Sequence, residues 1–211
     1  LTPVTRTRGL RRDWAPQTKP LPEHYWTGSQ QYLRPDAHEA FVRMVKDAYD
    51  NGHVDLYCTS GYRSFDTQCN LFASYAANEG CEQANTYSAH AGHSEHQLGT
   101  VCDIFAAPSS SGFLEPGTPG DIWLKANAYK YGFANSYPHA NASLNDGYIQ
   151  EVWHYRFIGV AAATELHNRG PIAVPVFIAS LSDAEREALG GGAAPAPNGN
   201  GGGETSGCGD F

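Results

Sequence analysis

Residues 94–103 read SEHQLGTVCD and decide the fold, because they place an imidazole and a carboxylate where a loop meets a strand. His96 ends a long stretch rich in Ser, His and Gly, whereas Asp103 lies in an apolar run that predicts a strand over 101–106. Gly99 allows the backbone to turn between these two side chains. Both groups are suitable zinc ligands, so this stretch predicts two ligands of a metal site.

The third ligand is expected in residues 151–154, which read EVWH within a strand predicted over 148–158. A catalytic zinc ion takes three protein ligands and keeps a fourth position for water. If the strands that carry Asp103 and His154 are neighbours in one sheet, both side chains can converge with His96 on one zinc ion. The chain has nine histidines, so the alternative is that these two are incidental polar residues.

Glu151 is the candidate general base. It precedes His154 by three residues, and positions three apart on a straight strand point to opposite faces of the sheet. A shared site therefore predicts irregular backbone, such as a bulge, at 151–153. A carboxylate beside a metal site can accept a proton from water and pass it to the leaving amine. The alternative interpretation is a surface acid.

Residues 60–64 read SGYRS and predict a turn before a helix that Ser64 caps. The guanidinium of Arg63 could hold a substrate carboxylate or stabilise the oxyanion that develops at the scissile carbonyl. Gln68, one turn into the helix, could face the same cleft. The alternative is that Arg63 is solvated or forms an ordinary salt bridge.

The remaining patterns indicate an α+β fold with a small antiparallel sheet and flanking helices, because helices and strands follow one another without a regular βαβ rhythm. Asp36, with Glu39 three residues later, resembles a capping box at the start of the first helix. Helices are expected over 37–51, from Ser64 onward, over 121–131 and over 160–168, and strands over 54–59, 101–106 and 148–158.

Composition divides the chain into four parts. They are an extended arm at 1–35 with five prolines, the domain with the candidate site at 36–170, a C-terminal extension packing on that domain at 171–189, and a Gly-rich, flexible tail at 190–211. Within the extension, the apolar run 172–178 predicts an extended segment, and Ser182 is expected to start a short helix.

The net charge of −8 argues against binding along a nucleic acid backbone. No apolar run is long enough to cross a bilayer. The arm carries the one basic cluster, which consists of Arg6, Arg8, Arg11 and Arg12. This cluster is interpreted as a solvated arm, and the alternative is an anchor to an anionic polymer or to the protein's own acidic surface.

The five cysteines contain no CxxC pair, which argues against a structural zinc ribbon. Two disulfides would leave one cysteine over, with Cys208 as the odd one. Disulfides favour an oxidising compartment, so we expect a secreted or periplasmic protein of the bacterial cell envelope. The alternative is a set of buried or unused thiols, and the sequence does not give the connectivity.

The motifs SxH(x)6D, ExWH and SGYRS together resemble the D-alanyl-D-alanine carboxypeptidase family of the vancomycin-resistance type, which also includes L,D-carboxypeptidases. The resemblance covers about residues 36–168 and departs from the family at Val152, where proline is frequent. Intermediate pieces agree, namely Trp123-Leu124, Tyr131-Gly132-Phe133 and Tyr155-Arg156-Phe157.

This resemblance implies the small α+β zinc-peptidase fold that the hedgehog signalling domain shares. It implies one zinc ion, held by His96, Asp103 and His154, with Glu151 as general base and Arg63 stabilising the transition state or the substrate carboxylate. It also implies that Gln68 and Ser94 border the substrate. Tyr62 and Trp153 are further candidates for substrate contact, and the alternative for Trp153 is a place in the core or the cleft wall.

The implied reaction is zinc-dependent hydrolysis of a peptide bond in peptidoglycan stem peptides, with release of a terminal D-alanine by a monomeric enzyme. One alternative is an endopeptidase that cuts within the stem or crossbridge. Another is a zinc-containing binding module without catalysis, although a structural zinc has four protein ligands as a rule and needs no base.

Overall fold

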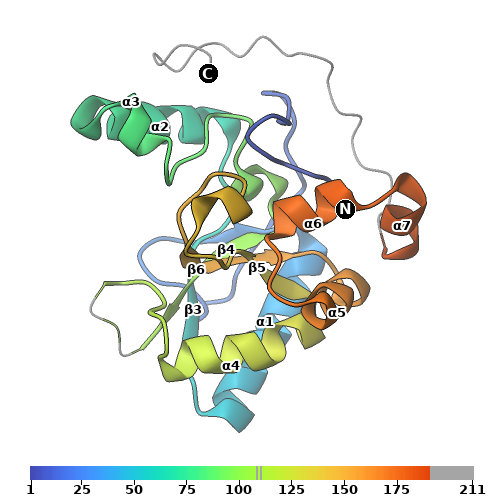
Figure 1. The fold of residues 1–211 in the computed structure, drawn as a ribbon. Coiled ribbons are helices and arrows are strands. Elements are labelled where there is room, and N and C mark those ends of the chain that lie inside the picture. The colour runs from blue at the N-terminus through green and yellow to red at the C-terminus, as the bar shows by residue number, and fades with distance from the viewer. Residues whose placement is uncertain (108, 110, 191–211) are drawn as a thin grey trace.

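A four-stranded antiparallel sheet forms the centre of the molecule, in a computed structural model that describes residues 1–107, 109 and 111–190. Its strands lie in the order β3 (Leu56–Ser60), β4 (Val101–Ala106), β6 (Glu151–Phe157) and β5 (Phe133–Tyr137). Helices flank this sheet (Figure 1), so the predicted α+β class is confirmed. The sequence analysis did not predict β5, which forms the edge next to β6.

Helix α1 (Pro35–Gly52) covers the sheet with the buried side chains of Phe41, Met44 and Val45. Pro35 occupies the first turn, where its missing N–H costs nothing, and Arg34 is the N-cap residue. The predicted capping by Asp36 is therefore wrong. Its carboxylate instead accepts from the Ala37 amide and pairs with Arg34.

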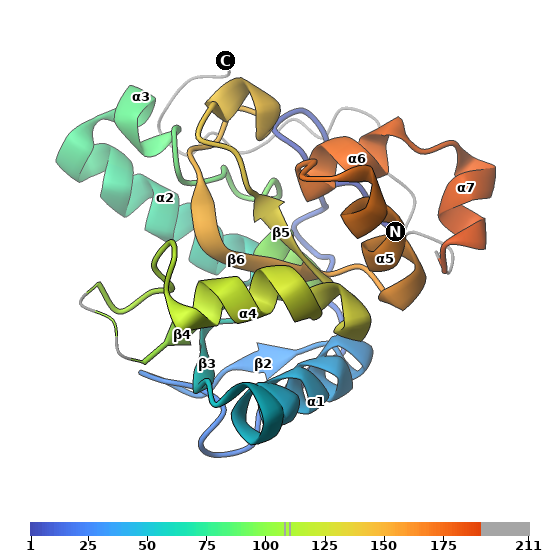
Figure 2. The same cartoon turned by 60° about the horizontal axis from the view of Figure 1, so that its bottom comes forward.

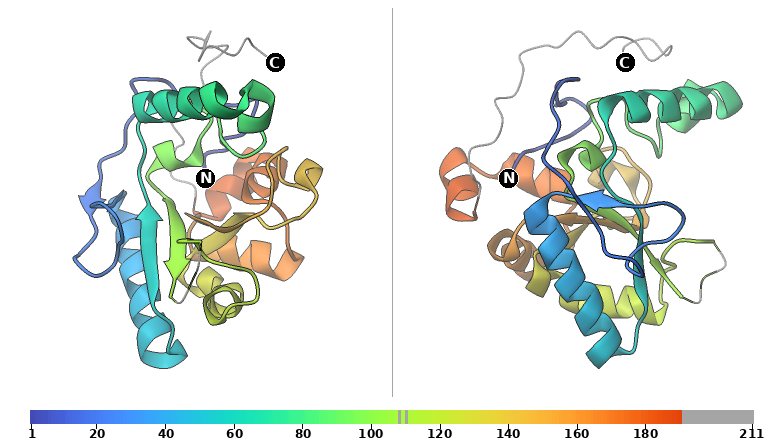
Figure 3. Two further views of the ribbon diagram at one scale, coloured as in Figure 1. Left: turned by 90° about the vertical axis from the view of Figure 1, so that its left-hand side faces the viewer. Right: turned by 180° about the vertical axis from the view of Figure 1, so that it is seen from behind.

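Helix α2 (Phe65–Glu79) lies at the end of the molecule opposite to α1 and α4 (Figures 1 and 3). The predicted cap is confirmed, because the Ser64 hydroxyl accepts from the Thr67 amide. The long segment that follows contains two short helical turns, α3 (Cys81–Ala84) and η1 (Glu95–Leu98).

The C-terminal half adds helices on the β5 side of the sheet. The predicted helix over 121–131 is divided into α4 and η2. Together the elements of this half are α4 (Pro119–Asn127), η2 (Ala128–Tyr131), η3 (Ala142–Leu144), α5 (Val160–Arg169), α6 (Val174–Ser180) and α7 (Asp183–Ala188). Figure 2 shows α4 across the front of the sheet and α5, α6 and α7 together at one end.

Helix α6 corrects the prediction of an extended segment over 172–178. Val174, Phe177 and Ile178 follow helical spacing and pack against α5. The segment is therefore helical, although its β-branched residues favour a strand. The predicted helix after Ser182 is confirmed, and Ser182 forms a complete capping box with Glu185.

The N-terminal arm packs along the domain and contains the short pair β1 (Lys19–Pro20) and β2 (Tyr32–Leu33). Trp26 forms an isolated bridge to Cys58, which brings the arm to the β3 edge of the sheet. A disulfide joins Cys58 on β3 to Cys102 on β4. The thiol of Cys69 is free, and Cys208 lies outside the described residues.

In the part of the chain that the structure describes, each helix is too short or too polar to cross a bilayer.

Candidate metal centre

The three predicted metal ligands converge in the structure. β4 and β6 are neighbours, and Asp103 lies directly opposite His154 in their register. Asp103 Oδ1 lies 3.3 Å from His154 Nδ1, and Asp103 Oδ2 lies 3.4 Å from His96 Nε2. One donor atom from each of the three side chains lies within 4.8 Å of the others, and all three side chains are buried.

Each histidine is oriented by a hydrogen bond from its other ring nitrogen. His96 Nδ1 lies 2.8 Å from the Gly61 carbonyl oxygen, and His154 Nε2 lies 3.2 Å from Glu95 Oε2. Because both partners accept, we assign the ring protons to these nitrogens, which leaves His96 Nε2 and His154 Nδ1 as the lone-pair atoms. Two imidazole nitrogens and a carboxylate oxygen therefore face one point, which fits a divalent cation such as zinc.

The local backbone explains how η1 delivers His96. The Ser94 hydroxyl accepts from the His96 amide and starts the turn. Gly99 ends it in the left-handed conformation, with φ of 69°, and its amide donates to the His96 carbonyl. A side chain at this position would be strained, so glycine allows the chain to pass at once from η1 into β4.

The electrostatics of the centre favour a cation. Burial lowers the pKa of His96, which keeps this ring in the neutral form that binds metals. Burial also disfavours charge on His154, but Asp103, Glu151 and Glu95 outweigh burial and raise its pKa well above the ordinary value. Burial similarly opposes ionisation of Asp103, but the two histidines hold its pKa far below the usual range.

Glu151 reaches the centre through the predicted irregularity of β6. Between the pairs Asn135–Tyr155 and Tyr137–Glu151, β5 advances by two residues and β6 by four, so β6 carries extra residues at this point. The side-chain amide of Asn135 donates to the Glu151 carbonyl and holds the irregular segment. As a result, Glu151 Oε2 lies 3.3 Å from His154 Nδ1. Burial raises the pKa of the Glu151 carboxyl, as expected for a group that exchanges protons near neutral pH.

Arg63 and Gln68 form a polar wall beside the metal ligands. Arg63 Nη1 donates to Gln68 Oε1 and Nη2 donates to Ser60 Oγ, both at 2.8 Å. Gln68 Nε2 in turn donates to the Ala89 carbonyl at 2.7 Å. These bonds fix the guanidinium at the cleft while its other N–H groups are available for a ligand.

A cleft of about 350 Å³ contains this centre. Arg63, Gln68, Ser94 and Trp153 line it as expected, whereas Tyr62 is not among its lining residues. Several further lining residues were not predicted from the sequence, namely Leu71, Tyr75, Tyr87, Ser88, Ala89, Glu95, Phe113, Tyr137, Tyr148 and Ile149. Apart from Glu95, which adjoins a predicted ligand, no sequence pattern distinguishes these residues.

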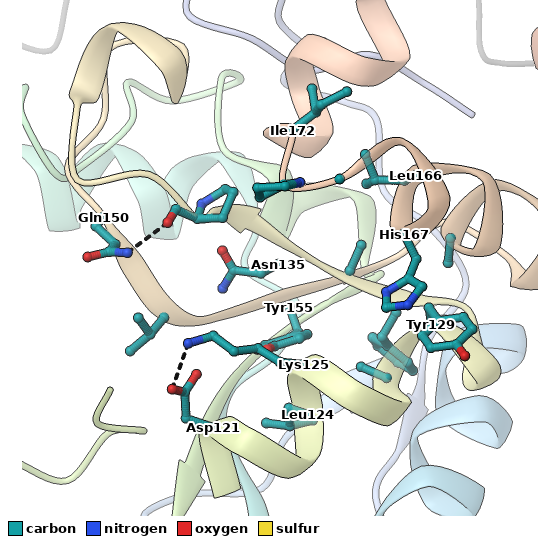
Figure 4. A pocket seen from close by; sticks show the side chains of 18 residues that line it. Asp121, Leu124, Lys125, Tyr129, Asn135, Gln150, Tyr155, Leu166, His167 and Ile172 are labelled. Carbon is teal, nitrogen blue, oxygen red and sulfur yellow. Dashed lines mark hydrogen bonds and ion pairs between the residues drawn. The ribbon is translucent and has the colours of Figure 1, made fainter. Parts of the chain in front are cut away.

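A second pocket of about 370 Å³ lies between β5, β6, α4 and α5 (Figure 4). Val152 and Tyr155 of β6 line this pocket, whereas Trp153 and His154 line the cleft, so the strand separates the two cavities. Asp121 and Lys125 form an ion pair at its rim. Among residues 1–107, 109 and 111–190, only the cleft brings three metal-ligating side chains together.

The sequence model of the D-alanyl-D-alanine carboxypeptidase family matches residues 30–160, which include every residue of the candidate centre. The chain belongs to the D-alanyl-D-alanine carboxypeptidase family. The resemblance inferred from the motifs is thereby confirmed.

Similar proteins include carboxypeptidases from bacteria. A curated relative, the putative carboxypeptidase YodJ of Bacillus subtilis, is 35% identical over 141 residues, which cover 66% of this chain and 51% of YodJ. The chain thus spans about half the length of that relative.

Among solved structures, the LdcB LD-carboxypeptidase matches with a TM-score of 0.75 and 28% identity over 85% of this chain and 86% of LdcB. A variant of the vancomycin-resistance D,D-pentapeptidase VanY in complex with Zn(II) matches with a TM-score of 0.68 and 25% identity, over 84% of this chain and 97% of VanY.

Proposed function

We propose that this protein is a zinc-dependent carboxypeptidase that removes a terminal D-alanine from peptidoglycan stem peptides. The observation that carries the proposal is the convergence of His96, Asp103 and His154 beside a buried carboxylate, Glu151. A binding module without catalysis would not need this fourth acidic group. Family membership and the solved VanY complex with Zn(II) support zinc as the metal.

His96 Nε2, His154 Nδ1 and an Asp103 oxygen would hold the ion. A zinc ion bound there would supply a Lewis acid and a lower pKa for the attacking water. Gly61 and Glu95 keep the two rings in the orientation that binding requires. In this proposal residues 36–170 form the catalytic unit, and the arm at 1–35 and the extension at 171–189 pack on it.

Glu151 acts as the general base and then as the general acid. Its carboxylate accepts a proton from the attacking water and returns it to the amine of the departing residue as the C–N bond breaks. The products are a shortened peptide with a new carboxylate and a free amino acid. The raised pKa of Glu151 brings its proton affinity closer to neutral pH than that of an exposed carboxylate.

Arg63 binds the negative charge of the substrate. Its guanidinium is fixed by Gln68 and Ser60 at the edge of the cleft, and a terminal carboxylate is a natural bidentate partner for such a group. In the transition state the same group can stabilise the developing oxyanion. This role favours carboxypeptidase over endopeptidase activity. Ser94 and Trp153 border the substrate in this proposal.

The first experiment is mass spectrometry of defined muropeptides after incubation with the zinc-loaded protein. We expect the pentapeptide to lose one alanine, and a chelator to abolish this loss. Glu151→Gln should lower kcat by about 10²–10⁴-fold, since that is the usual contribution of a general base. Glu165→Gln, on the surface of α5, is the matched control and should retain full activity.

Other products would change the assignment. Loss of alanine from the tetrapeptide alone would indicate an L,D-carboxypeptidase. Cleavage of crosslinked substrates alone would indicate an endopeptidase. If zinc binds but no substrate is cleaved, the proposal is wrong and the binding module becomes the better explanation.

We also propose that the protein works as a monomer in the cell envelope, outside the cytoplasm. The Cys58–Cys102 disulfide and a substrate in the cell wall support this location.

A further inference from the structure

Arg6 of the N-terminal arm lies against the domain, as does Arg12 of the basic cluster, which pairs with Asp66 of α2 at 2.9 Å. Arg11 pairs with Asp13 inside the arm, and both side chains are exposed. The Arg6 side chain instead donates from Nη2 to the carbonyls of Asn85 and Gly147, the latter at 3.0 Å. Arg6 lies outside the family match at residues 30–160.

The two carbonyls belong to two loops that are remote in sequence and adjacent in space. The Ile149 amide donates to the Thr86 carbonyl at 3.0 Å, which joins the loop after α3 to the loop before β6. Arg6 adds a bond to each loop from one guanidinium nitrogen. Its own backbone amide donates to Asp146 Oδ2 at 2.8 Å. One arm residue therefore connects both loops.

Both loops supply side chains to the cleft. Tyr87 and Ser88 come from the first loop, and Tyr148 and Ile149 come from the second. We call these four residues the loop wall of the cleft. None of these four residues is a metal ligand, Glu151 or Arg63, although the Ser88 hydroxyl accepts from Gln68 Nε2 at 3.3 Å. A contact that positions the loop wall therefore acts mainly on substrate binding.

Arg6 also positions the Tyr148 ring directly. Its guanidinium carbon lies 4.1 Å from the centre of that ring, which is a cation–π contact with a side chain only 4% exposed. Tyr148 packs on Tyr137, and Tyr137 packs on His154, with ring centres 5.1 Å and 5.0 Å apart. Aromatic packing thus continues from the arm to the metal centre.

The turn that receives Arg6 is shaped for it. Asp146 and Gly147 both have left-handed backbone conformations, with φ of 56° and 87°. A Cβ atom at Gly147 would lie 2.7 Å from Arg6 Nε, which is closer than a Cβ atom approaches a non-bonded neighbour. Aspartate tolerates this conformation better than most residues, and the bond from the Arg6 amide to its carboxylate stabilises the turn further.

We propose that Arg6 is a positioning residue that fixes the loop wall of the cleft and thereby sets the affinity for the stem peptide. This inference rests on the proposed function. Loss of Arg6 frees the Asn85 and Gly147 carbonyls and the Tyr148 ring, whereas the metal donors and Glu151 keep all their own partners. The Michaelis constant therefore rises and the chemical step is preserved.

The test compares Arg6→Gln, Arg6→Lys and the control Arg11→Gln in the zinc-loaded protein. For Arg6→Gln we expect KM for the pentapeptide to rise about tenfold, the usual effect of losing charged hydrogen bonds, with kcat within about twofold of the parent. Arg6→Lys should give an intermediate KM, because an ammonium can donate to both carbonyls but lacks the planar face that lies against the Tyr148 ring. Arg11→Gln should match the parent.

Hydrogen exchange gives a readout that does not depend on activity. Amides of 86–88 and 147–149 should exchange faster in Arg6→Gln than in the parent, while the amides of β4 keep their protection. Gly147→Ala closes the space for Arg6 and also strains the turn, because Gly147 has a φ of 87°, so it should give at least the exchange pattern and the higher KM of Arg6→Gln.

Parental KM together with parental exchange in Arg6→Gln would overturn the inference. A loss of activity that only follows the fraction of folded protein, at unchanged KM, would also overturn it. If the proposed function itself is wrong, the parent cleaves no stem peptide, and the exchange experiment still reports whether Arg6 holds the two loops.

Discussion

Glu95 is a buried acid that contacts one metal ligand and one counter-charge. Its Oε2 accepts from His154 Nε2 at 3.2 Å, and its Oε1 accepts from Arg156 Nη1 at 2.5 Å. The side chain is only 1% exposed, so both contacts are shielded from water. Burial alone would raise the pKa of Glu95, but Arg156, His154 and Ser136 together outweigh burial and lower this pKa to about 2. The Glu95 carboxylate therefore stays ionised at neutral pH and orients the His154 ring.

Replacing Glu95 with glutamine should weaken zinc binding while preserving side-chain shape. We expect a 10–100-fold loss of zinc affinity, which is typical when the partner of a metal-binding histidine is changed. Because Arg156 then keeps a buried charge without its counter-ion, stability should fall by about 3–5 kcal/mol. Competition with a chromophoric chelator measures the first effect and urea unfolding the second. Parental zinc affinity in Glu95→Gln, with Glu165→Gln as control, would contradict this role.

Residue chemistry explains which site residues could be predicted from sequence. His96, Asp103 and His154 belong to short motifs whose donor types are specific to metal binding. Tyr87 and Tyr148 come from loops and Arg6 comes from the arm, and their positions depend on contacts between segments that are distant in sequence. No local pattern encodes such contacts.

At the scale of elements, His38 anchors the arm to helix α1. Its Nε2 lies 3.1 Å from the Pro20 carbonyl in β1, and the ring is buried. Nδ1 is also buried and has no hydrogen-bond partner among the described residues, so protonation would create a donor without an acceptor. Burial, with a smaller effect from Lys19, lowers the pKa of His38.

A lowered pKa in the folded state means that the unfolded chain takes up the proton first as pH falls. The stability that neutral His38 provides is therefore present above its unfolded pKa of about 6.5 and is lost as pH falls below that value. We expect His38→Gln to flatten the decrease in the free energy of unfolding between about pH 7 and pH 5. Urea unfolding at several pH values measures this slope. Equal slopes in both proteins would show that His38 does not titrate on unfolding.

An element was predicted correctly where its own residues carry a strong signal, such as a capping serine. α2 and α7 carry serine caps and were predicted with their starts. α6 was misinterpreted, because valine, isoleucine and proline indicate extended chain while the buried period is helical. β5 contains alanine, asparagine and serine and has little strand propensity of its own, so its pairing with β6 determines it.

At the scale of the whole molecule, the metal centre joins three elements that are separate in the unfolded chain. The donors come from η1, β4 and β6, so the unfolded chain does not offer the same site. A ligand that binds only the folded state raises stability by mass action. Zinc binding is therefore coupled to the stability of the complete sheet.

We expect zinc at about 100 times its dissociation constant to stabilise the metal-stripped protein by about 2.7 kcal/mol. For a chain of this length such a gain corresponds to an increase in Tm of roughly 5–10 °C. Thermal unfolding with and without zinc measures the shift, and Mg²⁺ should give a much smaller one. His96→Ala should show little of it. An equal shift in His96→Ala would place the zinc elsewhere.

The position of β6 between β4 and β5 has a consequence for the time at which activity arises. β6 is the last strand of the sheet to leave the ribosome, yet it occupies an inner position and carries both His154 and Glu151. A nascent chain that ends before β6 has at most two of the three donors and no base. Pairing over such sequence separations is slow compared with local helix formation. Under the proposed function, a chain therefore becomes able to hydrolyse its substrate only when β6 has inserted between β4 and β5.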